Sequence, residues 1–327
     1  MRIAFEEIDY LRPTLISHPH LRHAIQPHSS GHDAWGFRNE RVPISTEILT
    51  IGDSLTYGVA ATADESWPSW LQRLSGKKVY NLALGGFGTS DYEWLLKHKA
   101  YQLKPKTVYI AIYLGNDLYR KQIGNEKRAQ SPTIQPPSRF QGWAGLVREY
   151  LSRNSMLYQV TKLNLSRLAY RLKSMTTNQG NTALIPLHFK HINTVLTPRR
   201  FPHEEDEIKL GMSRATNDTK RMMTECSAQP YDCVFLILPT KESVYYDLAR
   251  EALSATTFDP IRTQDRAESI MRNEISSVIN ERGFVVIDLL PSMKNAATLN
   301  SLYPENDDGH PNGTGYRVIA NAIAQTL

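Results

Sequence analysis

Residues 48–58 read Ile-Leu-Thr-Ile-Gly-Asp-Ser-Leu-Thr-Tyr-Gly, and this stretch decides the fold. A short, mainly apolar run ends abruptly in Gly-Asp-Ser, which predicts a buried strand followed by a tight turn. Such a turn would hold the Ser54 hydroxyl at the carboxyl edge of a sheet, where ligands of open α/β folds bind. Asp53 and Ser54 are also good helix-capping residues, so the stretch taken alone is equally consistent with a simple helix N-cap.

Apolar runs of the same kind recur along the chain and alternate with segments of helical periodicity. The further strands are expected at residues 79–84, 107–113, 234–238 and 284–289. Helices are expected near residues 67–74, 90–103, 207–226, 244–253 and 263–282, and an amphipathic helix closes the chain. Near-continuous apolar strands separated by helices are typical of a parallel sheet that is covered on both faces. The sequence therefore predicts a three-layer α/β/α domain with five parallel strands.

The domain is expected to span residues 45–327, and one region within it breaks the alternation. Residues 118–206 contain polar and proline-containing stretches around a helical segment near residues 143–172. We interpret this region as an inserted, mostly helical cap that folds over the carboxyl edge of the sheet and shapes a substrate pocket. Residues 1–44 are irregular and are expected to form an arm packed on the domain, anchored by Trp-Gly-Phe-Arg-Asn at 35–39.

The composition is that of an ordinary globular protein. Of 327 residues, 41% are hydrophobic and 22% are charged, with a net charge of +5. The basic excess is spread along the chain, which argues against a nucleic-acid partner. No apolar stretch reaches membrane-spanning length, so no transmembrane segment is expected. Residues 1–7 lack the apolar run of a signal peptide. As written, the chain is expected to be cytoplasmic, and periplasmic or secreted if a leader has been removed.

Cysteine and histidine usage does not indicate a metal site. The two cysteines, Cys226 and Cys233, do not have metal-binding spacing. They would pair across their short loop in an oxidising compartment, and otherwise Cys233 would fill the core. Half of the ten histidines lie in residues 1–44, but their spacing matches no common ligand pattern. We expect no metal and no cofactor.

Residues with the chemistry of nucleophilic catalysis follow the predicted strands. A serine attacks a carbonyl when a base removes its proton and preorganised donors hold the oxyanion. Ser54 follows the first strand, Gly85–Gly86 the second and Asn116 the third, while Asp307 and His310 share one loop before the last helix. The three-residue separation lets the Asp307 carboxylate bond one imidazole nitrogen while the other faces Ser54. Each residue alone has an ordinary structural explanation, but their common register with a parallel sheet favours a catalytic site.

Four blocks of the sequence resemble the SGNH hydrolases, also known as GDSL esterases and lipases. They are Gly-Asp-Ser-Leu at 52–55, Asn-Leu-Ala-Leu-Gly-Gly at 81–86, Gly-Asn-Asp at 115–117 and Asp-Asp-Gly-His at 307–310. The resemblance implies a flavodoxin-like fold of SGNH type with strand order 2-1-3-4-5.

The resemblance also implies the functional residues. The triad would be Ser54, His310 and Asp307, and the oxyanion hole would be formed by the Ser54 N–H, the Gly86 N–H and the Asn116 side chain. Asp53, beside the nucleophile, is expected to play a supporting role. Asp307 is preferred to Asp308 because of the Asp-x-x-His spacing, and Gly86 is preferred to Gly85 by counting from Asn81.

The function expected from the resemblance is ester hydrolysis through a covalent Ser54 acyl-enzyme. The stretch Gly-Phe-Arg-Asn at 36–39, followed by the Gly-Asp-Ser block, is similar to SGNH proteins associated with bacterial surface carbohydrate. We therefore expect a short acyl group, acetyl above all, on a small-molecule or saccharide substrate. The alternatives are an O-acyltransferase that uses the same triad and a non-catalytic carbohydrate-binding protein that retains the fold. A flavodoxin-type nucleotide binder ranks last because no phosphate-cradling glycine loop is present.

Overall fold

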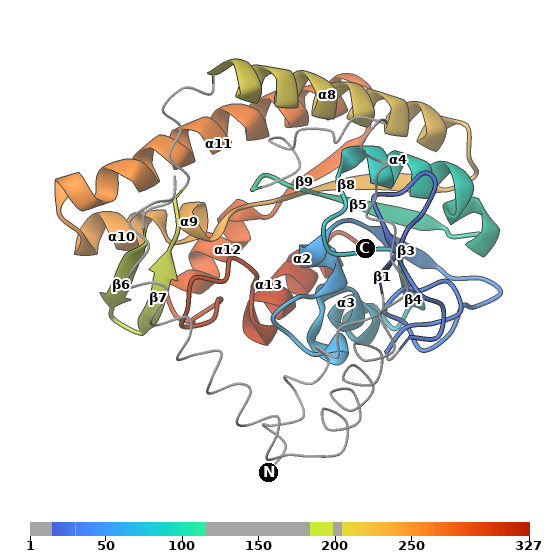
Figure 1. Cartoon of the computed structure of the whole chain (residues 1–327), viewed down its shortest axis with the longest axis horizontal. Helices are drawn as coiled ribbons and strands as arrows, with labels where there is room; N and C mark the ends of the chain where they lie inside the picture. The colour runs from blue at the N-terminus through green and yellow to red at the C-terminus, as the bar shows by residue number, and fades with distance from the viewer. Residues whose placement is uncertain (1–14, 30, 116–183, 199–204) are drawn as a thin grey trace, which may run out of the picture. The chain divides into compact units, whose positions relative to one another are not determined.

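A computed structural model describes residues 15–29, 31–115, 184–198 and 205–327 of the chain (Figure 1). These residues belong to one compact unit that spans residues 13–122 and 182–327. Most of the expected cap, including the helical segment near residues 143–172, lies outside the described residues. The first 14 residues of the expected arm lie outside them as well.

The core of the unit is a parallel sheet of five strands in the order β4-β3-β5-β8-β9. The strands are β3 (Ile48–Ile51), β4 (Val79–Asn81), β5 (Thr107–Tyr113), β8 (Asp232–Leu238) and β9 (Val285–Asp288). Every neighbouring pair in this sheet is parallel. Counted along the chain, this is the order 2-1-3-4-5, so the predicted fold class and strand order are confirmed.

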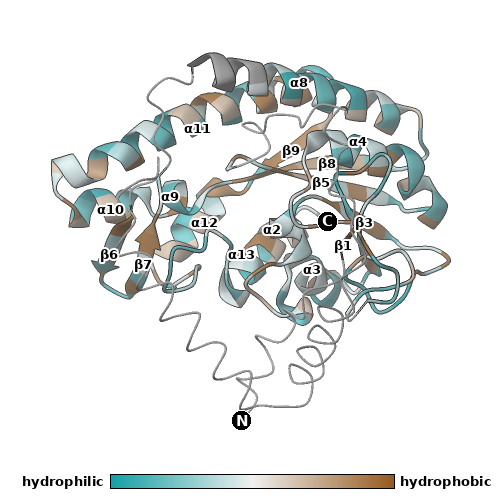
Figure 2. Cartoon of the chain, in the orientation of Figure 1, coloured by the Kyte–Doolittle hydropathy of each residue, from teal (hydrophilic) through white to brown (hydrophobic). Residues whose placement is uncertain are grey.

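Each central strand contributes side chains to two separate cores, one on each face of the sheet. In β5, Val108, Ile110 and Ile112 belong to one hydrophobic cluster, whereas Tyr109 and Ala111 belong to the other. Alternate side chains of a strand point to opposite faces. Because both faces are covered, the strands are apolar at nearly every position, as Figure 2 shows in brown for β5, β8 and β9. This explains the uninterrupted apolar runs in the sequence.

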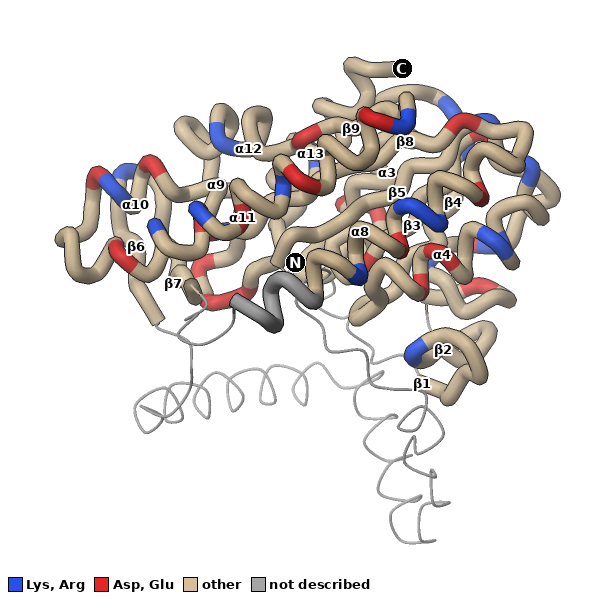
Figure 3. The backbone as a smooth tube through the Cα atoms, turned by 90° about the horizontal axis from the view of Figure 1, so that it is seen from above, with Lys and Arg blue, Asp and Glu red and all other residues tan. Residues whose placement is uncertain are grey.

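Helices cover both faces of the sheet, as Figure 1 shows. One face packs against helices that contribute to the first cluster, namely α4 (Thr89–His98), α8 (Glu205–Ser227) and α11 (Ala255–Glu281). The other face packs against helices of the second cluster, namely α3 (Trp67–Ser75), α12 (Leu290–Ala297) and α13 (Gly313–Ala324). Acidic and basic residues are interspersed along the described helices, for example along α11 (Figure 3).

Three helix boundaries differ from the sequence-based prediction. The helix expected at 90–103 ends at His98 and is followed by a 3-10 turn at Ala100–Leu103. The helix expected at 244–253 divides into α9 (Lys241–Val244) and α10 (Tyr246–Ala252). The helix expected from residue 263 begins at Ala255, because Ser254 caps it and its early residues Phe258 and Ile261 are buried, although Pro260 lies inside it.

Smaller elements surround the sheet. Two antiparallel pairs are present, β1 (Leu15–Ile16) with β2 (Ala24–Ile25), and β6 (Ile185–Phe189) with β7 (Ile192–Leu196). The second pair is the described part of the predicted insertion. Two short helices follow β3, namely α2 (Ser54–Tyr57) and the 3-10 turn η2 (Ala63–Glu65).

A disulfide joins Cys226 at the end of α8 to Cys233 in β8. Among the described helices, none combines the length and apolar character needed to cross a membrane.

Candidate active site

The nucleophile turn follows β3 at the carboxyl edge of the sheet. Gly52 allows the chain to turn tightly, since a Cβ at this position would lie 2.1 Å from Thr56 Oγ1. Asp53 is the N-cap of α2, and its Oδ1 accepts a hydrogen bond of 3.0 Å from the Leu55 N–H. Ser54 is the first residue of α2, and its Oγ also lies 3.4 Å from Asp53 Oδ2. The capping and nucleophile interpretations of this stretch are therefore compatible, because Asp53 caps the helix that presents Ser54.

The loop before α13 brings a histidine to the serine. His310 Nε2 lies 2.8 Å from Ser54 Oγ, although the two residues are 256 positions apart in the sequence. On the other side of the ring, His310 Nδ1 lies 2.5 Å from Asp308 Oδ1. The same Oδ1 accepts the backbone N–H of His310 at 3.0 Å. Serine, imidazole and carboxylate thus form one continuous chain of hydrogen bonds.

The carboxylate on His310 belongs to Asp308, so the expectation that Asp307 bonds the imidazole is wrong in this structure. Asp308 lies two residues before His310, and its side chain folds back over the intervening Gly309 to reach both the backbone and the ring. A short Asp side chain readily bonds a backbone N–H two residues further on. The turn therefore selects the nearer aspartate, which a spacing rule does not reveal.

The surroundings of Asp308 favour its ionised form. Burial alone would raise the pKa of this carboxyl. The hydrogen bond and charge of His310, the His310 backbone N–H and the charge of Lys241 outweigh burial, and the pKa of Asp308 lies below its ordinary value. An ionised Asp308 accepts the Nδ1 proton and leaves Nε2 as an acceptor for the Ser54 hydroxyl proton. This tautomer is the one that a general base requires.

The loop after β4 runs past the nucleophile. A Cβ built on Gly85 would lie 3.8 Å from Ser54 Cβ, so this loop and the serine are in contact. Gly86 adopts a left-handed conformation with φ of 89°, which favours glycine. Asn116, expected to be the third oxyanion donor, lies outside the described residues. The oxyanion-hole assignment therefore stays a prediction.

The arm contributes residues to the site that sequence reasoning did not assign. Arg38 donates to three carbonyl groups at and after the end of α2, those of Gly58 at 2.8 Å, Ala61 at 3.1 Å and Tyr57 at 3.3 Å. Its guanidinium also lies over the Tyr57 ring. The sequence signal for Arg38 was the stretch 35–39, which was predicted to anchor the arm without a prediction of what it contacts.

Asn39 of the arm bonds to Asn81, the last residue of β4. The Asn39 amide accepts from the Asn81 N–H at 2.9 Å and donates to the Asn81 carbonyl at 3.0 Å. The Asn81 side chain in turn donates to the Thr56 carbonyl in α2 and accepts from the Ala83 N–H. One asparagine thus links the nucleophile helix to the glycine loop beside it.

The histidines near the N-terminus pack against aromatic rings. His18 and His20 lie against Trp94, and His32 stacks on Tyr57. Within the described ranges, no three His, Cys, Asp or Glu side chains are grouped so that they could hold a metal ion.

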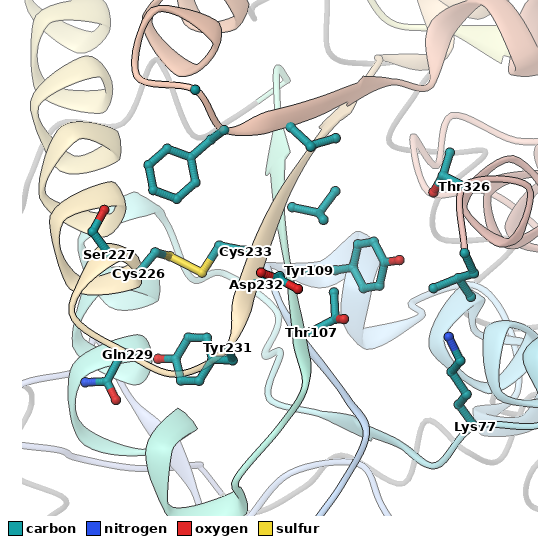
Figure 4. A pocket seen from close by; sticks show the side chains of 15 residues that line it. Lys77, Thr107, Tyr109, Cys226, Ser227, Gln229, Tyr231, Asp232, Cys233 and Thr326 are labelled. Carbon is teal, nitrogen blue, oxygen red and sulfur yellow. A yellow bond between two sulfur atoms is a disulfide. The ribbon is translucent and has the colours of Figure 1, made fainter.

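A pocket of about 600 Å³ lies at the amino ends of the strands, away from Ser54 and His310. Figure 4 shows Lys77, Tyr109, Asp232 and Thr326 in its walls, together with the Cys226–Cys233 disulfide. The same pocket contains Tyr231, whose burial raises the pKa of its hydroxyl to about 12. Ser54 and His310 are thus at the opposite edge of the sheet from this pocket.

Comparisons with known proteins identify related sequences and folds. The model of the GDSL-like lipase/acylhydrolase family matches residues 50–318. An acetylxylan esterase from Geobacillus stearothermophilus, solved as a catalytic mutant, is 12% identical with a TM-score of 0.45, covering 87% of this chain and 94% of that one. An extracellular lipase from Streptomyces rimosus is 14% identical with a TM-score of 0.45, covering 86% and 100%. The esterase EstA from a Pseudoalteromonas species is 11% identical with a TM-score of 0.43, covering 86% and 96%. No curated protein matches the chain.

Proposed function

We propose a substrate for this chain, which belongs to the GDSL-like lipase/acylhydrolase family and is a serine hydrolase. The proposed reaction is the hydrolysis of a short-chain acyl ester, acetyl above all, on a carbohydrate. The observation that carries the catalytic assignment is the 2.8 Å contact between Ser54 Oγ and His310 Nε2. Asp308 on Nδ1 completes the arrangement and takes the role that the sequence suggested for Asp307.

The first half of the reaction forms an acyl-enzyme. Ser54 Oγ attacks the ester carbonyl carbon while His310 Nε2 takes the hydroxyl proton, and the carbonyl π electrons move to the oxygen. As the tetrahedral intermediate collapses, the bond between the acyl carbon and the alcohol oxygen breaks. Nε2 then gives its proton to the departing alcohol oxygen. Throughout this half, Asp308 stabilises the imidazolium and keeps its orientation.

The second half releases the acid. A water molecule attacks the acyl carbon while His310 Nε2 takes one of its protons, and Ser54 recovers that proton when the acyl-enzyme bond breaks. The oxyanion formed in both halves would be held by the Ser54 N–H, the Gly86 N–H and the Asn116 side chain. Each such donor contributes roughly 3 kcal/mol of transition-state stabilisation. The reaction needs no metal or organic cofactor.

The preference for a short acyl group on a sugar rests on the residues around the site. Gly309 precedes His310, and Gly85 lies beside Ser54. Tyr113 is half-buried, and its hydroxyl would lie 3.8 Å from a Cβ placed on Gly309. An amphipathic aromatic side chain beside the histidine suits a polar alcohol better than a long acyl chain. Among the described residues, several large exposed apolar side chains, such as those of Leu15, Leu74, Ile270 and Leu299, come from separate parts of the chain.

The test compares the release of p-nitrophenol from p-nitrophenyl acetate by the wild type and by Ser54→Ala. We expect kcat to fall by about 10⁶-fold in the variant. Ser277→Ala, on the exposed side of α11, is the matched serine control and should retain full activity. Turnover that survives in Ser54→Ala would remove the nucleophile assignment.

Substrate class is tested with acyl-length and acceptor series. We expect kcat/KM to fall from acetate to octanoate esters, and acetylated xylo-oligosaccharides to release acetate. An increase from acetate to octanoate would contradict the short-acyl proposal. If unmodified oligosaccharides added as acceptors become acetylated faster than acetate is released, the enzyme is an O-acyltransferase that uses the same residues.

A further inference from the structure

Lys241 is a fully buried lysine at the carboxyl edge of the sheet. It is the first residue of α9, immediately after the loop that leaves β8, and its side chain is 0% exposed. Lysine is among the residues least often buried completely, because its ammonium group is strongly hydrated in water. A lysine in this environment needs compensating acceptors.

The ammonium group finds three acceptors around the histidine loop. Lys241 Nζ donates to the carbonyl oxygens of Asn306 and Asp308, each at 2.9 Å, and to Thr194 Oγ1 at 3.2 Å. An ammonium group has three protons, so these contacts use its full donor capacity. Both carbonyl groups belong to the loop that carries Asp308 and His310.

Thr194, in β7 of the β6–β7 hairpin, also holds the histidine loop. It is 0% exposed, and its hydroxyl lies 2.7 Å from the Pro304 carbonyl and 3.2 Å from the Asn306 carbonyl. The Val195 N–H also donates to the Asn306 carbonyl at 3.2 Å. Lys241 and Thr194 thus fix the backbone from Pro304 to Asp308 from two separate elements.

The fixed backbone leads directly to the catalytic hydrogen bonds. Asp308 is held by its carbonyl on Lys241, while its carboxylate holds both the backbone N–H and the Nδ1 of His310. No helix or strand spans residues 304–312, so hydrogen bonds from other elements, namely those of Lys241, Thr194 and the Val195 N–H, help to define this geometry. A displacement of Asp308 would be passed to the imidazole and change the distance from Nε2 to Ser54 Oγ.

We infer that Lys241, together with Thr194, is a positioning residue for catalysis that sets the orientation of the Asp308–His310 pair. The inference rests on the proposed catalytic role of that pair. The positive charge adds to the positional effect, because it favours the ionised carboxylate of Asp308. Burial lowers the pKa of Lys241, while the carboxylates of Glu242, Asp308 and Asp307 oppose that shift.

The experiment replaces the ammonium group and follows both rate and geometry. Lys241→Met keeps the aliphatic stem and removes all three donors. We expect kcat for p-nitrophenyl acetate to fall by about 10²-fold with KM unchanged, because misplaced catalytic groups lower kcat without altering ground-state binding. We also expect a strongly downfield proton resonance for the His310 Nδ1–H in the wild type, which should shift or disappear in the same variant.

A second, milder variant guards against a folding failure of the first. Thr194→Val has nearly the same shape and lacks the hydroxyl, so the one hydroxyl proton that the Pro304 and Asn306 carbonyls share is lost and one Lys241 proton loses its acceptor. We expect a loss of about tenfold in kcat and a smaller shift of the same resonance. The control is Cys226→Ala/Cys233→Ala, which removes a covalent link at the opposite end of the sheet.

Two results would overturn the inference. One is a wild-type kcat and resonance in Lys241→Met. The other is an equal loss of kcat in the cysteine control at matched thermal stability, because the effect would then reflect general destabilisation. The resonance is measured without substrate, so it judges the role of Lys241 even if Ser54→Ala shows that the proposed esterase activity is wrong.

Discussion

The two halves of the catalytic site are built in different ways. The nucleophile turn, residues 52–58, takes its geometry mainly from local structure, namely the end of β3, the Asp53 cap and the helix α2, whose C-cap is Gly58. The histidine loop, residues 304–312, has no helix or strand of its own and is held by Lys241 and Thr194, which lie between 65 and 112 positions away in the sequence. The nucleophile turn depends mainly on its neighbours in sequence, with added contacts from Arg38 and Asn81, whereas the histidine loop is anchored mainly by residues distant in sequence.

This difference explains why sequence reasoning identified the serine but chose the wrong aspartate. A strand followed by Gly-Asp-Ser favours a tight turn, which places Ser54 at the sheet edge. Two adjacent aspartates before His310 offer two plausible partners, and only the path of the loop decides between them. Spacing in sequence is a reliable guide where the backbone is regular and a weaker one where tertiary contacts shape it.

After Ser54→Ala, the largest expected effect comes from substituting the two aspartates separately. Asp308→Asn should lower kcat by about 10⁴-fold, because an amide in this position favours the wrong histidine tautomer. Asp307→Asn should reduce kcat by less than about tenfold, since only long-range charge is lost. Steady-state kinetics on p-nitrophenyl acetate measure both. If the two variants exchange these effects, the partner of His310 in the working enzyme is Asp307.

The disulfide provides a region in which stability and catalysis should separate. Cys226→Ala/Cys233→Ala opens a loop closed over a separation of 7 residues. The variant should lose about 2–3 kcal/mol of unfolding free energy. Because the bond lies at the amino end of the sheet, kcat at 25 °C should be unchanged. Denaturant unfolding and kinetics on the same samples give both values, and a parallel loss of kcat would show that the two ends of the sheet are coupled.

Substituting Arg38 in the arm should lower activity less than substituting Lys241, which holds the histidine loop. Arg38→Met removes the donors to the Tyr57, Gly58 and Ala61 carbonyls, but the cap and the strand still define Ser54. We expect kcat/KM to fall by about tenfold, which corresponds to one charge-assisted contact. Arg73→Met is the matched control, since Arg73 stacks on Trp70 away from the catalytic groups. An effect larger than that of Lys241→Met would reverse the comparison.

The smallest effect expected is a pH-dependent contribution to stability from Asp308. Its pKa is lower in the folded protein than in the unfolded chain, so the paired carboxylate stabilises the fold. This contribution is complete above the ordinary Asp pKa of about 3.9 and is lost as the pH falls through the lower folded value. The difference in Tm between the wild type and Asp308→Asn should therefore be constant near neutral pH and shrink in acid. A difference that stays constant in acid would contradict the assignment.

The sequence by itself determined the layers and most of the sheet edge. Apolar runs, buried on both faces in the central strands, specified five parallel strands, and the turn residues after them placed Ser54, Gly85 and Gly86 at one edge. These features depend on periodicity and local backbone chemistry, which a single sequence displays directly. The extent of α11 was less visible, because the burial of Phe258 and Ile261 outweighed the helix-breaking tendency of Pro260.

Tertiary structure alone decided which groups support the catalytic residues. His310 meets Ser54 only in the folded domain, and Lys241 and Thr194 contact the loop that carries His310 from two other elements. Arg38 reaches the nucleophile helix only because the arm folds against it. The physical reason is common to both cases. A hydrogen bond between residues distant in sequence depends on the packing of the whole domain, so its partners are not encoded by spacing or composition.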